Sequence, residues 1–321
     1  MLKILHYLMI GILSCFNWAF AQDAEFSQYY ANPLNLNPAL AGNKLCPRIT
    51  LNYRNQWPSI ANGFVTYTAS YDMYVEKLHG GIGFVFLNDK AGQGAVSSTA
   101  FSGIYSYCLN VSDKMEVNTA MQLTYQQNKI NWDKLTFADQ ESEKRPDNPS
   151  RGFPDFSAGI TVGYNKMMYM GVAVNHLTQP DISFYDNSEK STLDMKITAH
   201  WGALFDLHKG TTYGKTENQM SVSPNILYQQ QGNFHQLNIG CYLDNYPFTG
   251  GVWYRNSFEN PDAIIAMLGF RFSNFRIGYS YDYTISKLAN AGGGAHELSF
   301  AWQLPGFEKK HTLRQLEVPN F

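Results

Sequence analysis

The stretch MEVNTAMQLTYQQN, residues 115–128, alternates in chemistry from one residue to the next. Its odd-numbered positions from Met115 to Tyr125 are mostly apolar or aromatic, and its even-numbered positions are mostly charged, amide or hydroxyl side chains. Successive side chains of a β-strand point to opposite faces. The stretch therefore predicts a strand with one apolar face and one polar face.

The same alternation returns along the chain in segments of about ten residues, separated by turn-forming residues. Clear examples are residues 155–165, 196–207 and 275–284. The segments predict about fourteen strands, with starts near Arg48, Gly63, Gly80, Val96, Met115, Asp155, Met168, Met195, Asn218, Phe234, Pro247, Ala263, Phe275 and His296. An even number of strands fits a closed antiparallel barrel whose two ends lie on one side.

Strand length and aromatic content favour a membrane barrel over a secreted soluble β-sandwich, whose strands alternate in the same way. Strands of about ten residues exceed the soluble mode of about five or six and match what a tilted membrane strand needs. Only 16% of the chain is charged. The apolar faces carry aromatic residues, as in the girdles of outer-membrane barrels, at Tyr125, Tyr164, Trp201, Tyr283 and Trp302. We predict an all-β fold, a transmembrane antiparallel β-barrel of about 14 strands.

The connections between the expected strands sort into a short and a long set, as they do in outer-membrane barrels. With the N-terminus in the periplasm, short periplasmic turns fall near Glu76, Ser112, Lys166, Asn245 and Ser273, with one longer connection at residues 208–217. The opposite, extracellular set contains residues 90–94, 129–154, 179–193 and 287–294. Loops on a rigid scaffold are the expected place for partner contacts.

The first 21 residues predict export. Lys3 precedes an apolar run that ends in Ala19-Phe20-Ala21, the pattern of a secretory signal peptide with an A-x-A cleavage site. In the alternative interpretation, residues 12–15 form a lipoprotein cleavage box and Cys15 carries a lipid. No later apolar run reaches the length of a membrane helix, and a net charge of −2 gives no nucleic-acid footprint.

The segment that follows, residues 22–46, contains QYYANPLNLNPALAG at residues 28–42. Its two Asn-Pro pairs remove backbone donors and prevent it from joining a sheet. Irregular backbone at membrane depth is tolerated only where it is enclosed. We expect this segment either to turn into the barrel from the periplasmic side and plug the lumen, or to remain outside as a docking surface. The barrel itself is expected over residues 47–303, followed by a periplasmic tail at residues 304–321.

The polar faces of the expected strands carry charges of both signs, which predicts a polar lumen because such charges are costly on the lipid face. Mixed signs favour a mutually paired structural network over an ion-selective pore lining. The predicted lumen network comprises Arg54, Asp72, Lys196, His200, Asp206, Arg255, Arg271, Arg276, Asp282 and Glu297.

Catalytic and metal-binding signals are weak. The best Ser/Thr–His candidates are His296 with Ser299 and His200 with Thr198, and a lone His in a strand is more often a hydrogen-bonded wall residue. Three cysteines, Cys46, Cys108 and Cys241, predict neither a disulfide framework nor a zinc site and leave one pairing open. We therefore expect no catalytic residues, no cofactor and no metal.

The N-terminal motif, together with the RNQWP stretch at residues 54–58, resembles the PorP/SprF family of the type IX secretion system, and the similarity extends over essentially the whole chain. The motif residues are Gln28, Tyr29, Asn32, Pro33, Asn37, Pro38, Ala39, Gly42, Arg54, Gln56 and Trp57. The resemblance leaves open whether they serve a structural plug or contact a partner. One departure is the tail after Trp302, since barrels of this class often end on an aromatic residue of the last strand.

The resemblance implies a non-enzymatic outer-membrane barrel of Bacteroidota that assists the secretion or surface attachment of adhesin-like cargo, often used in gliding motility. Its implied partners are outer-membrane lipids, the secreted cargo and, in one branch of the family, periplasmic lipoproteins of the secretion machinery. The alternative function, drawn from the polar inner face, is a passive channel for small solutes.

Overall fold

The computed structural model describes residues 23–44, 46–60, 63–135, 148–165, 167–184, 190–207, 220–258, 261–286 and 292–304. The expected signal peptide with Cys15, the tail after Leu304 and parts of the expected loops lie outside these residues. Within the described residues, Cys46, Cys108 and Cys241 are free thiols.

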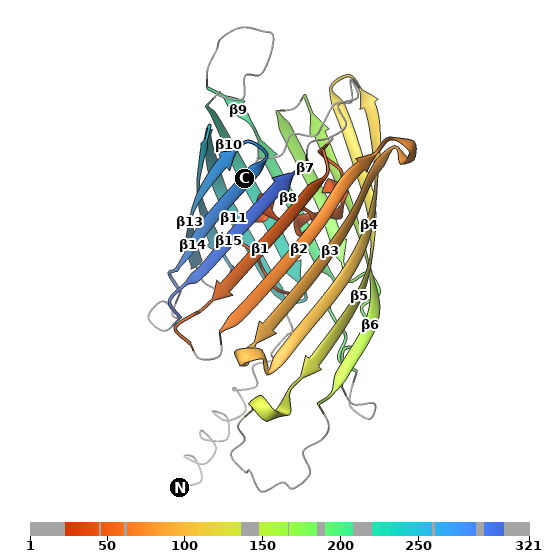
Figure 1. Cartoon of the computed structure of the whole chain (residues 1–321), viewed down its shortest axis with the longest axis vertical. Coiled ribbons are helices and arrows are strands. Elements are labelled where there is room, and N and C mark those ends of the chain that lie inside the picture. Colours follow the sequence, from red (N-terminus) through yellow and green to blue (C-terminus); the bar gives the residue numbers. More distant parts are fainter. Residues whose placement is uncertain are drawn as a thin grey trace, which may run out of the picture.

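Fourteen strands form one closed antiparallel barrel, shown in Figure 1. The two-residue strand β9 continues β8, because both pair with β10. The strands are β1 (Arg48–Gln56), β2 (Phe64–Val75), β3 (Gly80–Ala91), β4 (Val96–Ser112), β5 (Met115–Ile130), β6 (Ser150–Tyr164), β7 (Met168–Asn175), β8 (Lys196–Ala203), β9 (Phe205–Asp206), β10 (Ser221–Gln231), β11 (Phe234–Asn245), β12 (Phe248–Asn256), β13 (Pro261–Phe272), β14 (Phe275–Thr284) and β15 (Ala295–Gln303).

The barrel closes where its first and last strands pair. β1 lies between β2 and β15, and Arg48 faces Gln303 in the register of that seam. All other neighbours follow chain order and are antiparallel. Closure gives the strands hydrogen-bonding partners on both sides, which is the condition for a sheet to stand in lipid.

Strand starts agree with the sequence prediction to within three residues except at β6, which begins at Ser150 rather than near Asp155. The expected loop at residues 129–154 is shorter because Lys129 on β5 still pairs with Ser150. Gly152 and Pro154 are residue types that are uncommon inside strands. They are tolerated because pairing of β6 with β7 begins only at Ala158, so Pro154 needs no partner on that side.

The two faces of the wall differ in chemistry as the alternation predicts. On β5, Glu116, Asn118 and Thr124 are buried inside, whereas the side chains of Met121 and Tyr125 are 69% and 56% exposed on the outside. Leu268 on β13 is 71% exposed. The barrel thus carries an apolar outer band. In the described part of the chain, none of the helices has both the length and the apolar character required to cross a bilayer.

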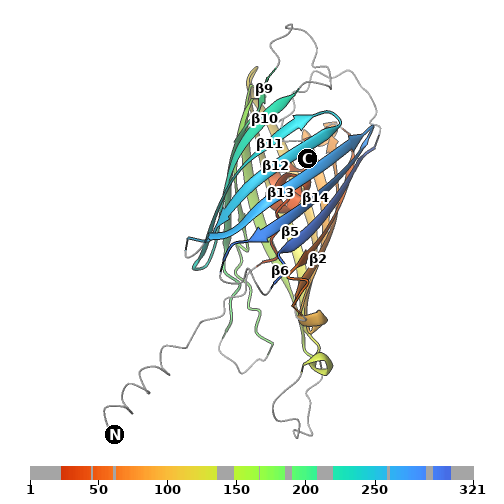
Figure 2. The same cartoon turned by 90° about the vertical axis from the view of Figure 1, so that its left-hand side faces the viewer.

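The two ends of the barrel differ in their connections. At the turn end, at the top of Figure 1, most connections are short, as at residues 113–114 and 273–274. At the loop end, at the bottom, long connections follow β5 and β7. β4, β5 and β6, of 17, 16 and 15 residues, are the longest strands of the barrel, and in Figure 2 they reach furthest toward the loop end.

Residues 23–44, here called the luminal segment, lie inside the barrel, where Figure 2 shows them in red between the strands. Residues 26–34 and 36–43 are all buried. The segment contains three short helices: η1 (Tyr29–Ala31), α2 (Pro33–Leu36) and η2 (Pro38–Leu40). Three more single turns, η3 (Glu76–Leu78), η4 (Gly92–Gly94) and η5 (Trp132–Lys134), lie in connections between strands.

Candidate functional site in the barrel lumen

The two Asn-Pro pairs start the short helices of the luminal segment. Pro33 and Pro38 occupy the first positions of α2 and η2, where a missing N–H costs no hydrogen bond. Asn37 caps η2, since its side-chain oxygen accepts a hydrogen bond from the Ala39 N–H at 2.9 Å. The motif thus folds into successive single turns rather than into a strand.

Glycines let the segment touch the wall. Gly42 has a φ of +69°, and a Cβ atom added there would lie 2.5 Å from the Cα atom of Gly81 on β3. Its N–H donates to the Asp72 carboxylate at 2.9 Å. On β6, a Cβ on Gly159 would lie 2.2 Å from the Asn37 Oδ1. Backbone contact at these points is open only to glycine.

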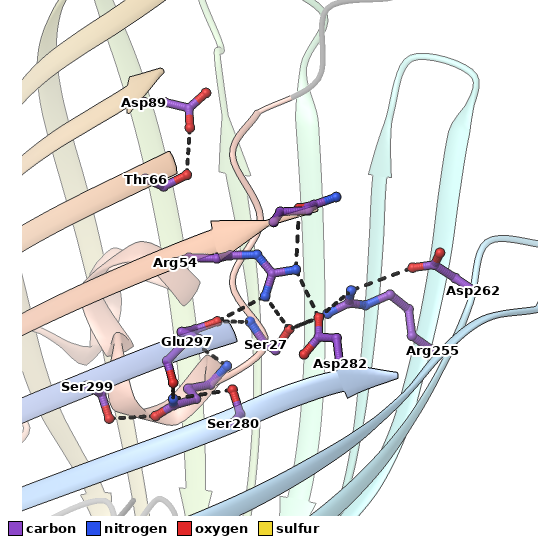
Figure 3. Close-up of polar contacts among 12 residues, drawn as sticks. Ser27, Arg54, Thr66, Asp89, Arg255, Asp262, Ser280, Asp282, Glu297 and Ser299 are labelled. Atoms are coloured by element: carbon purple, nitrogen blue, oxygen red, sulfur yellow. Dashed lines mark hydrogen bonds and ion pairs between the residues drawn. The ribbon is translucent and has the colours of Figure 1, made fainter. Parts of the chain in front are cut away.

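A buried charge cluster fastens the segment to β1, β12, β14 and β15 (Figure 3). Arg54 donates to Asp282 at 2.9 Å and to Glu297 at 3.2 Å. Arg255 donates to the same Asp282 oxygen at 3.1 Å. Ser27 sits among them: its hydroxyl donates to Asp282 at 2.6 Å and accepts from Arg54 and Arg255 at 2.7 and 2.6 Å.

The backbone of the segment is satisfied by the same cluster. The N–H groups of Ser27 and Gln28 donate to the Glu297 carboxylate at 2.7 and 3.2 Å. The Gln28 amide donates to the Glu297 carbonyl oxygen at 2.9 Å and accepts from the Ser299 hydroxyl at 2.5 Å. Two guanidinium groups therefore face two carboxylates, and Ser27 and Gln28 add hydrogen bonds to both carboxylates, which makes the buried charge more tolerable.

The opposite wall meets the segment with aromatic and aliphatic side chains. The Tyr29 ring lies 5.1 Å from that of Trp253 in an edge contact, and Tyr30 contacts Tyr169 and Tyr242 at 5.7 and 6.1 Å. Together with Leu36 and Leu40 of the segment, the cluster contains Leu227, Ile265 and Met267 of the wall. The charge cluster and the apolar cluster meet on β12, which contributes Arg255 to the first and Trp253 to the second.

At the loop end, the first described residues are held by a histidine between two carboxylates. The His176 ring nitrogens lie 3.0 Å from Asp23 and 2.8 Å from Asp155, and the Lys196 ammonium lies 3.6 Å from Asp23. Burial by itself lowers the pKa of His176, but the charges of Asp23 and Asp155 outweigh it and raise that pKa to about 9. Burial opposes ionisation of Asp23, yet His176 and Lys196 hold its pKa below the usual value.

The remaining predicted lumen residues are distributed over the length of the barrel. Asp72 pairs with Arg48 at 2.9 Å near the turn end, and His200 contacts the Asn37 amide at 3.2 Å. Arg271 pairs with Asp244 at 2.6 Å, and Arg276 donates to Gln303 at 3.3 Å. Asp206 is exposed on β9 and lies outside these buried contacts.

Gln56 and Trp57 of the motif lie at the loop end rather than in the charge cluster. Gln56 accepts from Arg54 at 3.4 Å. Trp57 has a φ of +59°, and its ring packs against Phe64 at 5.6 Å. The backbone N–H of Trp57 donates to the Gly294 carbonyl oxygen at 2.8 Å, and this bond links the β1–β2 and β14–β15 connections.

The two Ser/Thr–His candidates differ in geometry, because Thr198 and His200 share the inner face of β8 whereas His296 and Ser299 do not share a face. His296 contacts the Tyr279 hydroxyl at 2.8 Å on the outer face, whereas Ser299 points inward and donates to Gln28. An odd separation in one strand places them on opposite faces. His200 is enclosed beneath the luminal segment with Tyr30 and Asn37.

A cavity of about 610 Å³ remains between the luminal segment and the β2 to β6 wall, toward the loop end. Leu34 and Asn35 of the segment line it from one side, and Ser102, Gln122 and Gln126 line it from the wall. The lumen is therefore filled toward the turn end and hollow toward the loop end.

Several residues of this site were missed from the sequence. Arg48 shares the phase of Arg54 on β1, so the alternation contains the signal for it. The continuous apolar run at residues 263–268 on β13 signals a strand that is covered on both faces. His176 carries no such signal, because it turns inward through a φ of +59° just after β7 ends.

Comparison with known proteins follows this geometry. A family model described as "Type IX secretion system membrane protein PorP/SprF" matches residues 19–302. A comparison with curated proteins gives no match. The toluene transporter TbuX of Ralstonia pickettii has a similar fold, with a TM-score of 0.52 and 10% identity, covering 85% of this chain and 93% of that chain. A FadL homologue of Pseudomonas aeruginosa gives a TM-score of 0.48 and 10% identity, covering 89% of this chain and all of that chain.

Proposed function

The chain belongs to the PorP/SprF family of type IX secretion system membrane proteins, with the fold of an outer-membrane barrel, and we propose that it assists the secretion or surface attachment of a partner cargo protein without being an enzyme. The observation that carries the proposal is the family match, which extends from residue 19 to residue 302 and so includes both the luminal segment and the barrel wall. The cargo is proposed to be adhesin-like and to serve surface adhesion or gliding.

The filled lumen supports an accessory role over a passive solute channel. The luminal segment contacts opposite walls, since Asn32 donates to Thr68 on β2 and Asn37 contacts His200 on β8. At that level Ala39 and Leu40 are fully buried. These contacts and this burial support a lumen that the segment blocks to solutes.

The orientation follows from the rule that short turns face the periplasm and long loops face outward. We place the loop end, with the described residues of the connections that follow β5 and β7, outside the cell, where it is available to cargo. The turn end, where β1 begins and β15 ends, faces the periplasm and is the proposed side for lipoproteins of the secretion machinery.

The test is deletion of the gene in its native host combined with recovery of the tagged protein from outer membranes. We expect the tagged barrel to co-purify with a secreted protein, and the deletion strain to lose surface display of that protein while other type IX substrates are still secreted. Display that continues normally in the deletion strain would refute the proposal. A barrel that repeatedly purifies alone and conducts ions would favour the solute channel.

A further inference from the structure

The cavity at the loop end is lined by wall side chains that the luminal segment does not cover. It opens between this segment and the inner faces of β2 to β6 and has a volume of about 610 Å³. Toward the turn end, the same inner faces of β3, β4 and β5 pack against Leu34, Ala39 and Ala41 of the segment. The empty part of the wall is therefore continuous with a part that already holds polypeptide.

The β4–β5 part of this wall is a row of hydroxyl and amide side chains. The Gln122 amide nitrogen donates to Ser102 and Thr124 at 3.3 and 3.1 Å. The Gln126 amide nitrogen donates to Ser98 and Asn128 at 2.9 and 3.1 Å. These bonds fix both carboxamides, and within the described residues neither carbonyl oxygen accepts a hydrogen bond. Both are available as fixed acceptors for a ligand.

Asp89 adds a carboxylate to the same wall. Its Oδ1 accepts a hydrogen bond from the Thr66 hydroxyl at 2.6 Å, and Figure 3 shows this pair apart from the Arg54 cluster. No arginine or lysine of the described part of the chain forms an ion pair with it. By contrast, Asp72, Asp282 and Glu297 are each paired with a guanidinium group.

The contacts of the luminal segment show what ligand such a wall holds. Backbone N–H groups of the segment donate to lumen carboxylates, as Gly42 does to Asp72 at 2.9 Å and Ser27 to Glu297 at 2.7 Å. A wall hydroxyl donates to a segment carbonyl, as Ser106 does to Ala41 at 2.6 Å. Carboxylates, amides and hydroxyls on the empty part of the wall can make the same bonds to a second polypeptide.

We propose that this cavity binds a short polypeptide stretch of the secreted partner, with a lysine or arginine side chain directed to Asp89. The inference rests on the proposed function, because it assigns the partner's contact to the inside of the barrel mouth. A basic residue fits because it would supply the ion pair that Asp89 lacks, and the Gln122 and Gln126 carbonyl oxygens would accept backbone N–H groups of the ligand.

The direct test measures binding of a labelled peptide to the purified full-length protein in detergent by fluorescence anisotropy. The probe is Gly-Ser-Asn-Lys-Asn-Ser-Gly, and matched probes carry glutamine or glutamate in place of the lysine. We expect the lysine probe to bind about tenfold more tightly than the glutamine probe, the size of effect typical of a hydrogen bond to a charged group. Asp89→Asn should abolish that preference.

Two variants test whether the probes bind in the cavity or elsewhere on the protein. Ala100→Trp fills the cavity from β4 and should weaken binding of every probe, whereas Asp206→Asn, an exposed aspartate at the turn end, should change nothing. Heat-dependent migration on gels checks that each variant is a folded barrel. Three results would overturn the inference. The lysine probe does not bind the wild type, or it binds the wild type and Asp89→Asn with equal affinity, or maltohexaose displaces it, which would indicate a glycan site.

The two proposals fail separately. If a secreted protein co-purifies with the barrel but the lysine probe does not bind, the cavity inference is wrong and the accessory role stands. If the probe binds through Asp89 but the deletion strain keeps normal surface display, the accessory role is wrong and the cavity remains a peptide site.

Discussion

At the scale of single residues, Ser27 shows how a small side chain organises buried charge. Its hydroxyl bonds to two arginines and one aspartate, and its N–H bonds to Glu297. Ser27 is fully buried, so an apolar residue there would leave these charged groups without the hydrogen bonds of its hydroxyl. The luminal segment and four wall strands are therefore joined through one residue.

Removal of one arginine from this cluster should strongly destabilise the protein. Arg54→Met leaves Glu297 without its guanidinium partner and Asp282 with only one, so we expect a loss of about 3–5 kcal/mol in the free energy of unfolding. The control is Arg271→Met, whose pair with Asp244 is partly exposed near the turn end and should contribute about 1 kcal/mol or less. Urea unfolding in detergent, followed by tryptophan fluorescence, measures both. Similar losses in the two variants would contradict the buried-cluster account.

The contact between Gly42 and Gly81 gives a second prediction. Gly42→Ala places a methyl group 2.5 Å from the β3 backbone at a positive φ, and such overpacking is expected to cost about 1–3 kcal/mol. Gly103→Ala on β4 is the matched control, since its added Cβ would meet nothing within 4 Å. Thermal unfolding of the two purified variants should show a lower midpoint for Gly42→Ala alone. An unchanged midpoint would mean that the luminal segment shifts to accommodate the methyl group without loss of stability.

At the scale of elements, the luminal segment is held at both ends by charge and in the middle by packing. Its loop end is clasped by His176, Lys196 and Gln231, and its turn end by Arg48 and Asp72. Between them, aromatic side chains of the segment and wall form an apolar core within the lumen. The segment thus behaves as an internal layer of the fold rather than as a loose extension.

The stability that His176 contributes through its contacts with Asp23 and Asp155 should depend on pH. Because the pKa of His176 is raised to about 9 in the folded protein, its contribution to stability is complete below its unfolded pKa of about 6.5. The contribution is lost as pH rises through about 9. We expect His176→Gln to be less stable than the wild type at pH 6 and nearly equal to it at pH 10, as measured by unfolding free energies.

His235→Gln, at the same end of the barrel, is the control for loss of a histidine that bonds to Tyr228 and not to a carboxylate. A constant difference between wild type and His176→Gln from pH 6 to pH 10 would show that His176 acts through packing alone.

At the scale of the whole molecule, the barrel encloses a segment of its own chain. The wall is apolar outside, while inside it presents both polar and aromatic groups to the segment. Hollow space remains toward the loop end.

Deletion of residues 24–44 should convert the barrel into a channel. The segment lies buried inside the barrel at Leu40, so its removal is expected to open a continuous path. We expect the deletion variant to show stepwise ion conductance in planar bilayers and the wild type to show little. A wild type that conducts as well as the deletion variant would instead favour the solute-channel alternative.

The local pattern of residues is enough to predict the strands, their order and their faces. Period-two alternation is a local property, because a strand between lipid and lumen must present apolar and polar residues in turn. The prediction was wrong at the start of β6, where Gly152 and Pro154 resemble a loop but lie on a strand with one partner. The Asn-Pro motif likewise excluded the sheet and left open where the segment lies.

Only the tertiary structure decided which lumen groups meet. Ser27 and Glu297 are 270 residues apart, and Arg54 and Asp282 come together only because closure of the barrel places β1 next to β15 and near β14. The inner aromatic core depends in the same way on strands from both halves of the chain. His176 reaches Asp23 through one backbone angle at a strand end. Alternation says which side of the wall a residue faces, whereas its partner is set by closure and by the path of the luminal segment, which no local pattern encodes.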